Sequence, residues 1–426
     1  MSRHRSRRDV PRVLLLLPKE SYRSEDFLHA AEILEIDVIV AGNQCHQLAD
    51  HWQLDKLLSL PFDNPAKAAK MVQKVLAGSA PQAVIGIDDH GVEAAAAIAE
   101  ALKLKSNSRL AVETLRDKYR FRKMQQQLGL PYPAFVPIQI SNNRINQFRP
   151  FEFPAVVKPT RLSGSRGVIR VNAAEELDEA INRIDDIIRH SKMDSSDISL
   201  LVEQYLEGSE HALEAIMEEG ELCTLAIFDK PDPLQGPCFA ETIYVTPSCL
   251  SKGNQMEYQR QVQMICRQAG ILNGPIHAEA RIYHGTVTLL EVAPRSIGGL
   301  CGKVLRHALG MSLEELILRH ALGEAVPAID SSNPAVGVMM LPVHVAGIFN
   351  GIDGIDKAQA VPGIEAIEIS ARPGDRVLPL PEESIYLGFV FASGESPEFV
   401  VSALRAARDC LQINIKPILN VAASGG

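Results

Sequence analysis

The stretch "HAEARIYHGTVTLLEVAPR", residues 277–295, decides the fold, because it sets two glutamates on neighbouring strands. Its two apolar runs flank the dipeptide HG, a pattern that predicts a β-hairpin. A two-residue loop would place Glu279 opposite Leu290, with the two glutamates on opposite faces. A three-residue loop would place Glu279 directly opposite Glu291.

The distance between these glutamates decides their chemistry. In the second register their Cβ atoms would be about 5 Å apart, and carboxylates that close repel unless they share a proton or a cation. Mg²⁺ typically binds one or two carboxylates together with substrate phosphates. We therefore expect the three-residue loop and a metal site at Glu279 and Glu291. Two solvated surface acids remain an alternative. His277 shares the face of Glu279 and could approach the same site, although a structural histidine is commoner.

Length and composition restrict the class of protein. A chain of 426 residues exceeds the size of a single hydrophobic core, so two or three domains are expected. A net charge of −9 disfavours a nucleic-acid surface. The cysteines form no CxxC pair, which indicates reduced thiols and a cytoplasmic protein. The apolar run Val13–Leu17 is too short for a signal peptide, and no run reaches the ~20 residues that span a bilayer.

Hydrophobic periodicity divides the chain into three units. Residues 1–115 alternate short apolar strands with helical segments, which predicts a doubly wound parallel sheet. Ligands bind beyond the carboxyl ends of such strands, here at "DDHG" (88–91). A dinucleotide is disfavoured because G-x-G-x-x-G is absent. Residues 116–325 form the second unit, and 326–426 a small, strand-rich α+β unit.

Three motifs of the second unit suggest a nucleotide site. The loop "TRLSGSRG" (160–167) has glycines, hydroxyls and arginines that suit a polyphosphate, although a hairpin turn has the same composition. Lys158 ends an apolar strand, where a buried ammonium is costly without an anion; an exposed lysine is the alternative. "LLVEQYLEG" (200–208) could present its backbone to a purine, with Glu203 and Glu210 as acceptors, or form an amphipathic edge strand.

These motifs, in this order, resemble the ATP-grasp ligase superfamily over roughly residues 1–325. "RDKYRFRKMQQQLGLPYP", "PAVVKP", "EQYLEGSEH" and "LLEVAPR" carry the resemblance. The segments "PCFAETIYVTPSCLS" and "RSIGGLCGKVLRHALGMSLEELILRHALG" resemble the L-amino-acid ligase (dipeptide synthase) branch, as does the terminal "GFVFASGESPEFVVSALRAA". The resemblance implies a pre-ATP-grasp domain over 1–115, an ATP-grasp domain over 116–325 with a mobile lid at about 121–202, and a C-terminal domain over 326–426.

The resemblance also assigns residues. The nucleotide would be bound by Lys118, Lys158, Ser163, Gly164, Ser165, Gly167, Glu203, Gln204, Leu206 and Glu210. Glu279 and Glu291 would bind Mg²⁺ or Mn²⁺. Arg295 would be the catalytic residue, placed to stabilise the oxyanion of a tetrahedral intermediate and to face the substrate. Gly298 and Gly299 would leave space for a bulky acyl side chain.

The implied activity is an ATP-dependent carboxylate–amine ligase. An amino acid or similar carboxylate would become an acylphosphate, and an amine, such as a second amino acid, would attack it to give a dipeptide or amide, ADP and phosphate. The expected partners are ATP and small amino-acid-like molecules, with no nucleic acid and no membrane; a homodimer is common in similar enzymes. Ala293 departs from the pattern, since many members have asparagine there. A purine or biotin carboxylase is the alternative, and a non-catalytic nucleotide-binding protein is a third possibility.

Overall fold

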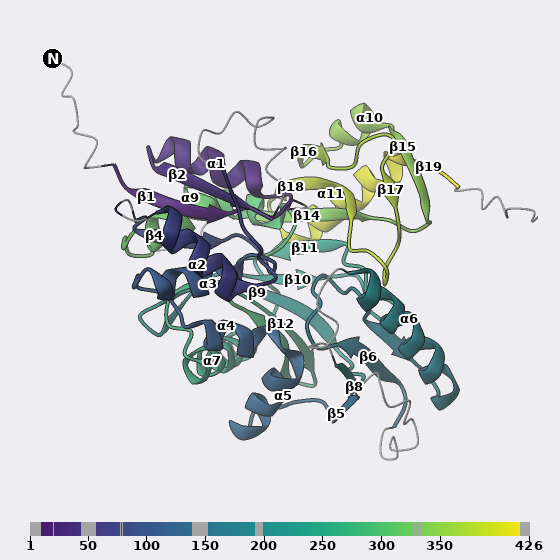
Figure 1. Cartoon of the computed structure of the whole chain (residues 1–426). Helices are drawn as coiled ribbons and strands as arrows, with labels where there is room; N and C mark the ends of the chain where they lie inside the picture. Colours follow the sequence, from purple (N-terminus) through teal and green to yellow (C-terminus); the bar gives the residue numbers. More distant parts are fainter. Residues whose placement is uncertain are drawn as a thin grey trace, which may run out of the picture.

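The computed structural model describes residues 10–19, 21–43, 57–76, 78, 80–138, 152–191, 199–327, 329 and 334–417. An N-terminal α/β layer, a large central sheet, a small sheet with its own helix and a strand-rich C-terminal region pack around one another (Figure 1). This arrangement confirms the predicted mixed α/β fold class.

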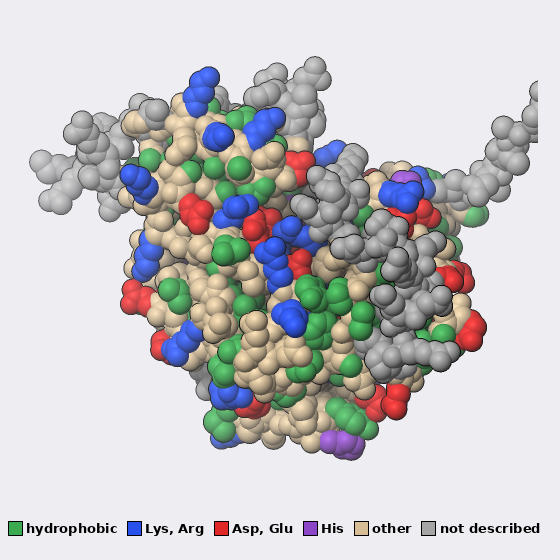
Figure 2. Space-filling model, turned by 60° about the horizontal axis from the view of Figure 1, so that its bottom comes forward, with side chains coloured by type: hydrophobic (Ala, Val, Ile, Leu, Met, Phe, Trp, Pro, Cys, Tyr) green, Lys and Arg blue, Asp and Glu red, His purple; other side chains and the backbone are tan. Residues whose placement is uncertain are grey.

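The surface carries charges of both signs. Figure 2 shows acidic and basic side chains scattered over one face, with several Lys and Arg side chains near its middle. Within the described part of the chain, no helix is long and apolar enough to cross a membrane.

The N-terminal layer is a parallel sheet with helices on both faces. Its elements are β1 (Arg12–Leu16), α1 (Ser24–Ile33), β2 (Asp37–Gly42), β3 (Leu57–Ser59), α2 (Pro65–Val75), β4 (Ala83–Gly86) and α3 (Val92–Ala101). The strand order is β3-β2-β1-β4, and every pair is parallel. Leu14 and Leu16 pack toward α2 and α3, while Leu15 faces the cluster that contains Phe27 of α1. Because helices cover both faces of this sheet, β1 can be apolar at successive positions.

Two short helices connect this layer to the small sheet. The elements are α4 (Arg109–Arg116), α5 (Lys118–Gln127), β5 (Phe135–Ile138), β6 (Ala155–Pro159), β7 (Ile169–Val171), η4 (Ala174–Glu176), α6 (Leu177–His190) and β8 (Leu200–Gln204). Asp117 ends α4 and begins α5, where its side chain accepts the N–H of Arg120. The sheet is antiparallel in the order β5-β8-β6-β7. The apolar stripe of α6, which includes Ile184 and Ile188, covers one face of it.

The central sheet has eight strands. Its first elements are β9 (Ser209–Glu218), β10 (Glu221–Lys230), β11 (Ile243–Thr246), α7 (Lys252–Ala269), β12 (Gly274–Tyr283), β13 (Thr286–Ala293), η6 (Cys301–Leu305), α8 (Arg306–Leu309) and α9 (Leu313–Ala321). One face packs against α4 and α7, and the other faces α9 and the N-terminal layer. Successive residues of β9, such as Ala212 and Leu213, point to opposite faces of the sheet. Because both faces are covered, both residues are buried.

The C-terminal region continues the same sheet. Its elements are β14 (Ala335–Pro342), β15 (Gly347–Asp353), α10 (Ile355–Gln359), β16 (Ile364–Ile369), β17 (Arg376–Val377), β18 (Tyr386–Gly394), α11 (Pro397–Cys410) and β19 (Gln412–Lys416). The strand order is β13-β12-β9-β10-β11-β14-β18-β16, so strands from either side of residue 326 are hydrogen-bonded neighbours. β17, β15 and β19 form a separate three-stranded sheet.

The loop of the β12–β13 hairpin differs from our prediction. Tyr283 pairs with Thr286, so His284 and Gly285 alone form the loop. Both have positive φ, 48° and 80°, as the tightest hairpin turns require. The predicted three-residue loop is therefore wrong.

The predicted pairing of the two glutamates is nevertheless present. Ala280 pairs with Leu289, whereas Glu279 pairs with Glu291, so Leu290 is an extra residue in β13. Such a bulge shifts the register by one residue beyond it. It therefore restores the alignment that the two-residue loop alone would not allow.

A fully buried arginine stabilises the bulge. The Leu289 carbonyl accepts hydrogen bonds from Arg122 Nη1 at 3.2 Å and Gln125 Nε2 at 3.1 Å. Arg122 Nε also donates to Glu203 Oε1 at 2.7 Å, and Lys158 Nζ lies 2.6 Å from the other oxygen of that carboxylate. Helix α5, the bulge and β8 thus meet at one guanidinium, and Glu203 connects it to Lys158 of β6.

The small sheet also contacts the C-terminal region. Gly167 donates its backbone N–H to the carbonyl of Pro381 at 2.9 Å. Arg183 of α6 binds both carboxylate oxygens of Glu382, at 2.7 and 3.0 Å. The segment before β18 therefore holds the small sheet over the central one.

Replacing Arg122 with methionine should lower the free energy of unfolding by about 3 kcal/mol or more, because a buried carboxylate and a buried carbonyl lose their donor. Urea unfolding of the purified protein measures this change. Arg120, which is exposed on the same helix, is the matched control, and its methionine variant should stay within about 0.5 kcal/mol. Equal losses in both variants would contradict a special role for Arg122.

Candidate functional site

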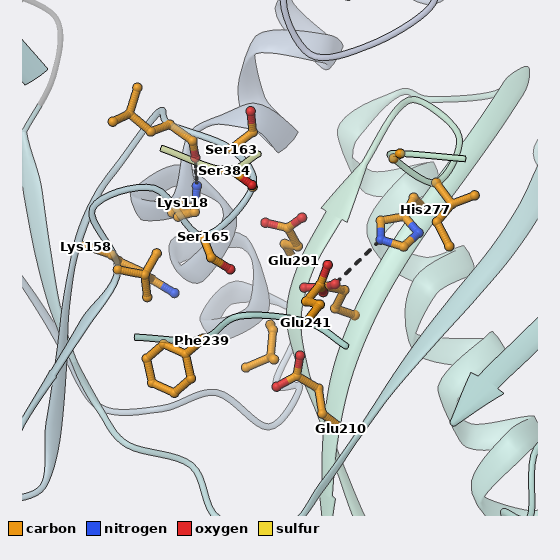
Figure 3. Close-up of a pocket in the computed structure, with 18 of the residues that line it drawn as sticks. Lys118, Lys158, Ser163, Ser165, Glu210, Phe239, Glu241, His277, Glu291 and Ser384 are labelled. Carbon is orange, nitrogen blue, oxygen red and sulfur yellow. Dashed lines mark hydrogen bonds and ion pairs between the residues drawn. The ribbon is translucent and has the colours of Figure 1, made fainter. Parts of the chain in front are cut away.

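A cavity of about 240 Å³, here the main cavity, lies between the small sheet and the central sheet. Figure 3 shows lysines and serines on one side of it and carboxylates on the other. Sequence-predicted residues that line it are Lys118, Lys158, Ser163, Gly164, Ser165, Glu203, Gln204, Leu206, Glu210, Glu279, Glu291, Arg295, Gly298 and Gly299. Gly167 lies outside the lining and packs against Pro159 with φ of 67°.

The basic side of the main cavity holds two lysines. Lys158 Nζ lies beside the buried Glu203, and burial lowers its pKa to about 8 despite that carboxylate. The strand lysine thus has the anion that its sequence position required. Lys118 Nζ donates to the Leu162 carbonyl at 2.5 Å, at the start of the glycine loop, residues 162–167. Two consecutive residues of that loop, Gly164 and Ser165, have positive φ.

One part of the lining of the main cavity, here called the flat end because it carries the Phe239 ring, is largely apolar. Val156, Leu206, Phe239 and Leu290 line it. Phe239 is stacked on Tyr205 with ring centroids 6.5 Å apart. The connection after β8 supplies both exposed backbone and this aromatic support, a combination that suits a planar heterocycle.

The acidic wall consists of Glu210, Glu241 and Glu279, and sequence reasoning found only two of its members. All three carboxylates bind Lys230 Nζ, at 2.9, 2.6 and 2.7 Å. The Lys230 side chain is 3% exposed, and the three anions outweigh burial to raise its pKa well above the usual value. Burial alone would raise the pKa of Glu241, but the Lys230 ammonium holds it at about 2.

Lys230 and Glu241 were missed although one signal was available. Lys230 ends the apolar run "AIFDK", as Lys158 ends "PAVVK". A lysine at the end of a buried strand should have prompted the same search for an anion. Its three acidic partners come from distant segments, so no local pattern connects them.

Another part of the lining, here the tyrosine end, is formed by Tyr22, Tyr244 and Tyr386. The Tyr244 hydroxyl donates to Glu241 at 2.5 Å, and the backbone N–H of Tyr386 donates to the Tyr22 hydroxyl at 3.0 Å. Met340 completes this largely apolar space. An apolar side chain of a small molecule would fit such a lining.

The two glycines after Arg295 differ in the space beside them. A Cβ at Gly298 would meet no atom within 4 Å, whereas one at Gly299 would lie 2.9 Å from the Phe389 ring. Gly299 also has φ of 58°, which disfavours other residues. Both glycines line the cavity, but only Gly298 of the two has room for a side chain.

Arg295 is held by the N-terminal layer. Its Nε donates to Asp89 at 2.7 Å, while its Nη2 lies 3.9 Å from Glu291. Asp89 follows β4 in the predicted "DDHG" segment, so that segment contacts the arginine. Burial would raise the pKa of the Asp89 carboxyl, but Arg295 and Arg116 hold it far below its usual range.

His277 belongs to the wall of the site. Its Nδ1 lies 3.2 Å from the buried Glu214, and its Nε2 lies 3.6 Å from Glu279. Burial would lower its pKa, but these carboxylates raise it to about 9. Glu214 also accepts the backbone N–H of Ile297, so the histidine belongs to the network that fixes the loop after Arg295.

The main cavity contains carboxylates that could bind a divalent cation. One oxygen from each residue of the acidic wall lies within 4.8 Å of the others, but Lys230 already contacts all three. Glu291 has Arg295 as its neighbouring cation, at 3.9 Å. Glu279 and Glu291 are paired across the hairpin and line the same cavity, a hard-oxygen donor set that fits Mg²⁺ or Mn²⁺. Ala293 adds no ligand.

Comparison with known proteins identifies both main parts of the chain. Residues 151–304 match the ATP-grasp domain, and residues 339–416 match the L-amino acid ligase C-terminal domain 2. The crystal structure of an L-amino acid ligase from Bacillus licheniformis superimposes with a TM-score of 0.81 and 25% identity, covering 95% of this chain and 99% of that chain. The chain therefore carries an ATP-grasp domain and an L-amino acid ligase C-terminal domain, and over nearly its whole length it is similar to an L-amino acid ligase. The resemblance seen in the sequence is thereby confirmed.

Curated relatives of this ATP-grasp protein are more distant in sequence. Alanine–anticapsin ligase from Bacillus amyloliquefaciens is 23% identical over 318 residues, covering 68% of this chain and 65% of the relative. Dapdiamide A synthase from Enterobacter agglomerans is 25% identical over 298 residues, covering 67% and 65%. The chain thus spans a little under two thirds of the length of these relatives.

Replacing Lys230 with methionine should destabilise the protein more at pH 8 than at pH 5. In the wild type the pKa of Glu241 is about 2 against an ordinary 4.5, so its contribution to stability is present above pH 4.5 and is lost as the pH falls toward 2. Without the ammonium, three adjacent, partly buried carboxylates repel one another; protonation relieves this repulsion at low pH, and the repulsion grows as the pH rises.

Urea unfolding in EDTA at the two pH values checks this sign. We expect a loss of about 3 kcal/mol at pH 8 and a smaller loss at pH 5. Lys252 is exposed at the start of α7, so its methionine variant should show a small loss at both pH values. A loss for the Lys230 variant that does not depend on pH would contradict the charge cluster.

Proposed function

We propose that the protein is an ATP-dependent ligase that joins the carboxylate of an amino acid, or a similar acid, to an amine through an acylphosphate. One observation carries this proposal: Lys118 and Lys158 face Glu279 and Glu291 across a single cavity beneath a glycine loop. This arrangement collects a triphosphate between cations on one side and a metal-binding carboxylate pair on the other. The products would be a dipeptide or amide, ADP and phosphate.

The nucleotide would lie along the basic side. Its base fits the flat end, between Leu206 and Leu290, against the backbone that follows Glu203 and Gln204. Glu210 lines the same end and suits the ribose. The phosphates would then pass Lys158 and reach Lys118, where Ser163 and Ser165 of the glycine loop offer hydroxyls and backbone N–H groups.

Charge neutralisation is the main requirement of phosphoryl transfer. Mg²⁺ or Mn²⁺ held by Glu279 and Glu291 would supply part of it when bound. Lys118 and Lys158 would neutralise further phosphate charge and hold the γ-phosphoryl group in line with the acceptor. Lys230 would keep Glu279 in place, because the ammonium fixes one of its oxygens at 2.7 Å.

The acceptor carboxylate would lie beside Arg295, with its side chain toward the tyrosine end. The carboxylate oxygen attacks the γ-phosphorus, forming the acylphosphate as the bond to ADP breaks. The lone pair of a neutral amine then attacks the acyl carbon; the C–N bond forms, the C–O bond to phosphate breaks, and phosphate leaves with that electron pair while the amine proton passes to water. Arg295 is placed to stabilise the oxyanion between these events.

Water must be excluded while the acylphosphate exists. The contacts of Gly167 and Arg183 with the segment before β18 hold the small sheet over the cavity, which would limit hydrolysis. The cysteines among the described residues are free thiols, which supports a cytoplasmic location, where ATP is available.

Replacing Glu291 with glutamine should reduce ADP formation at least about 100-fold, because an anionic ligand is lost while size and shape are kept. ADP release is measured with ATP, Mg²⁺ and pools of amino acids, and mass spectrometry identifies the product. Glu398 on α11 lies outside the cavity lining, and its glutamine variant should retain wild-type turnover. ADP release that requires bicarbonate and ignores amino acids would instead indicate the carboxylase alternative.

A further inference from the structure

A second, smaller cavity of about 20 Å³, here the side cavity, adjoins the main one. The two share Lys118, Leu162, Ser163, Glu291 and Arg295. The side cavity continues between the start of the glycine loop and the helices α4 and α5. The junction is therefore the place where the proposed phosphoryl and acyl transfers would occur.

The side cavity is basic. Its lining contains four cationic side chains, and the acids that neutralise them are fewer. The cations are Arg116, Lys118, Arg161 and Arg295, and the acids are Asp89, Glu291 and the adjacent Glu93. Once Lys118 serves the phosphates and Glu291 a metal ion, three arginines face the carboxylates of Asp89 and Glu93, an excess of one positive charge.

Two of these arginines share one carboxylate. Arg116 Nη1 and Arg161 Nη2 bind the same oxygen of Glu93, at 2.7 and 2.5 Å. One carboxylate oxygen thus serves two guanidinium groups. In addition, Arg161 Nε is buried and has no hydrogen-bond partner within the described structure. Guanidinium groups with donors to spare recognise carboxylates well.

We propose that Arg161, assisted by Arg116, binds the carboxylate of the amine donor in the side cavity. The second substrate is then an α-amino acid, and a simple amine or an amino-acid amide is a poor substitute. This inference rests on the proposed ligase function and specifies its second substrate. The amine would reach the acyl carbon from the junction beside Arg295, on the side away from the nucleotide.

The main cavity offers no comparable place for this carboxylate. Its acidic wall sets the three carboxylates of Glu210, Glu241 and Glu279 against the single ammonium of Lys230, and this wall would repel another anion. The lysines of the basic side are committed to phosphate in the proposed complex. The side cavity is accordingly the region beside the junction whose excess charge is positive.

Arg161→Gln tests the proposal. Wild-type protein is first given ATP, Mg²⁺, a panel of amino acids as acyl donors and hydroxylamine, which traps acylphosphates without needing a carboxylate. With the acyl donor so found, KM is measured for L-alanine and for L-alaninamide as amine donors. We expect the wild type to prefer L-alanine, and Arg161→Gln to raise the KM for L-alanine about 10-fold, the loss of one charge-assisted hydrogen bond.

The ratio of the two KM values separates recognition from a general structural defect. Arg161→Gln should bring the two KM values close together, and Arg161→Lys should restore part of the preference because the charge remains. Arg120 is exposed and outside both cavities, and its glutamine variant should keep the wild-type ratio.

Two results would overturn the inference, and they differ from each other. If wild type uses L-alanine and L-alaninamide equally, or if Arg161→Gln keeps the wild-type ratio, the side cavity does not recognise the carboxylate although the ligase function stands. If hydroxylamine elicits no amino-acid-dependent ADP release from the wild type, the proposed function itself fails, and the inference fails with it.

Discussion

The extra residue Leu290 in β13 is the constraint on which the candidate site depends. Side chains alternate between the two faces of a strand, so regular pairing beyond the two-residue loop would set Leu290 opposite Glu279 and turn Glu291 to the other face. The bulge interrupts the ladder, and Arg122 and Gln125 offset this by donating to the Leu289 carbonyl. Arg122 also binds Glu203 of the small sheet. The same guanidinium therefore connects the strand that carries Glu291 to the sheet that carries Lys158.

Buried ion pairs also connect the N-terminal layer to the loop that begins at Arg295 and to helix α9. Asp89 holds Arg295, and Arg23 binds the buried Glu314 as well as the carbonyl of Ile297. A charge removed from water is tolerated only when its partner is in place, so these pairs restrict how the layer can sit against the central sheet. The loop from Arg295 to Gly299 is consequently shaped by residues more than 200 positions earlier in the chain, although it contributes its own side chains to the cavity.

The sequence predicted those features that local rules control. Alternating strands and helices led to the parallel N-terminal sheet, and the lysine of "PAVVK" required an anion, which proved to be Glu203. The hairpin loop was misjudged because turn chemistry gives no sign of a bulge several residues away. Lys230 and Glu241 were missed because the cluster that they form joins residues 11 to 49 positions apart, which no local pattern connects. The continuity of the central sheet past residue 326 depends on non-local pairing as well.

The charges that line the two cavities would separate the substrates of the proposed reaction in space. The single ammonium of Lys230 balances part of the charge of the acidic wall, so the three carboxylates can stay ionised. The negative charge that remains repels further anions. The cationic surface divides between the lysines of the main cavity and the arginines of the side cavity, and these meet at Arg295. Phosphate groups and the carboxylate of an incoming amino acid would then occupy separate cationic regions, which prevents their mutual repulsion from displacing either one. The electrophilic carbon lies where the two regions meet, so the electrostatics that separate the substrates would also orient them toward each other.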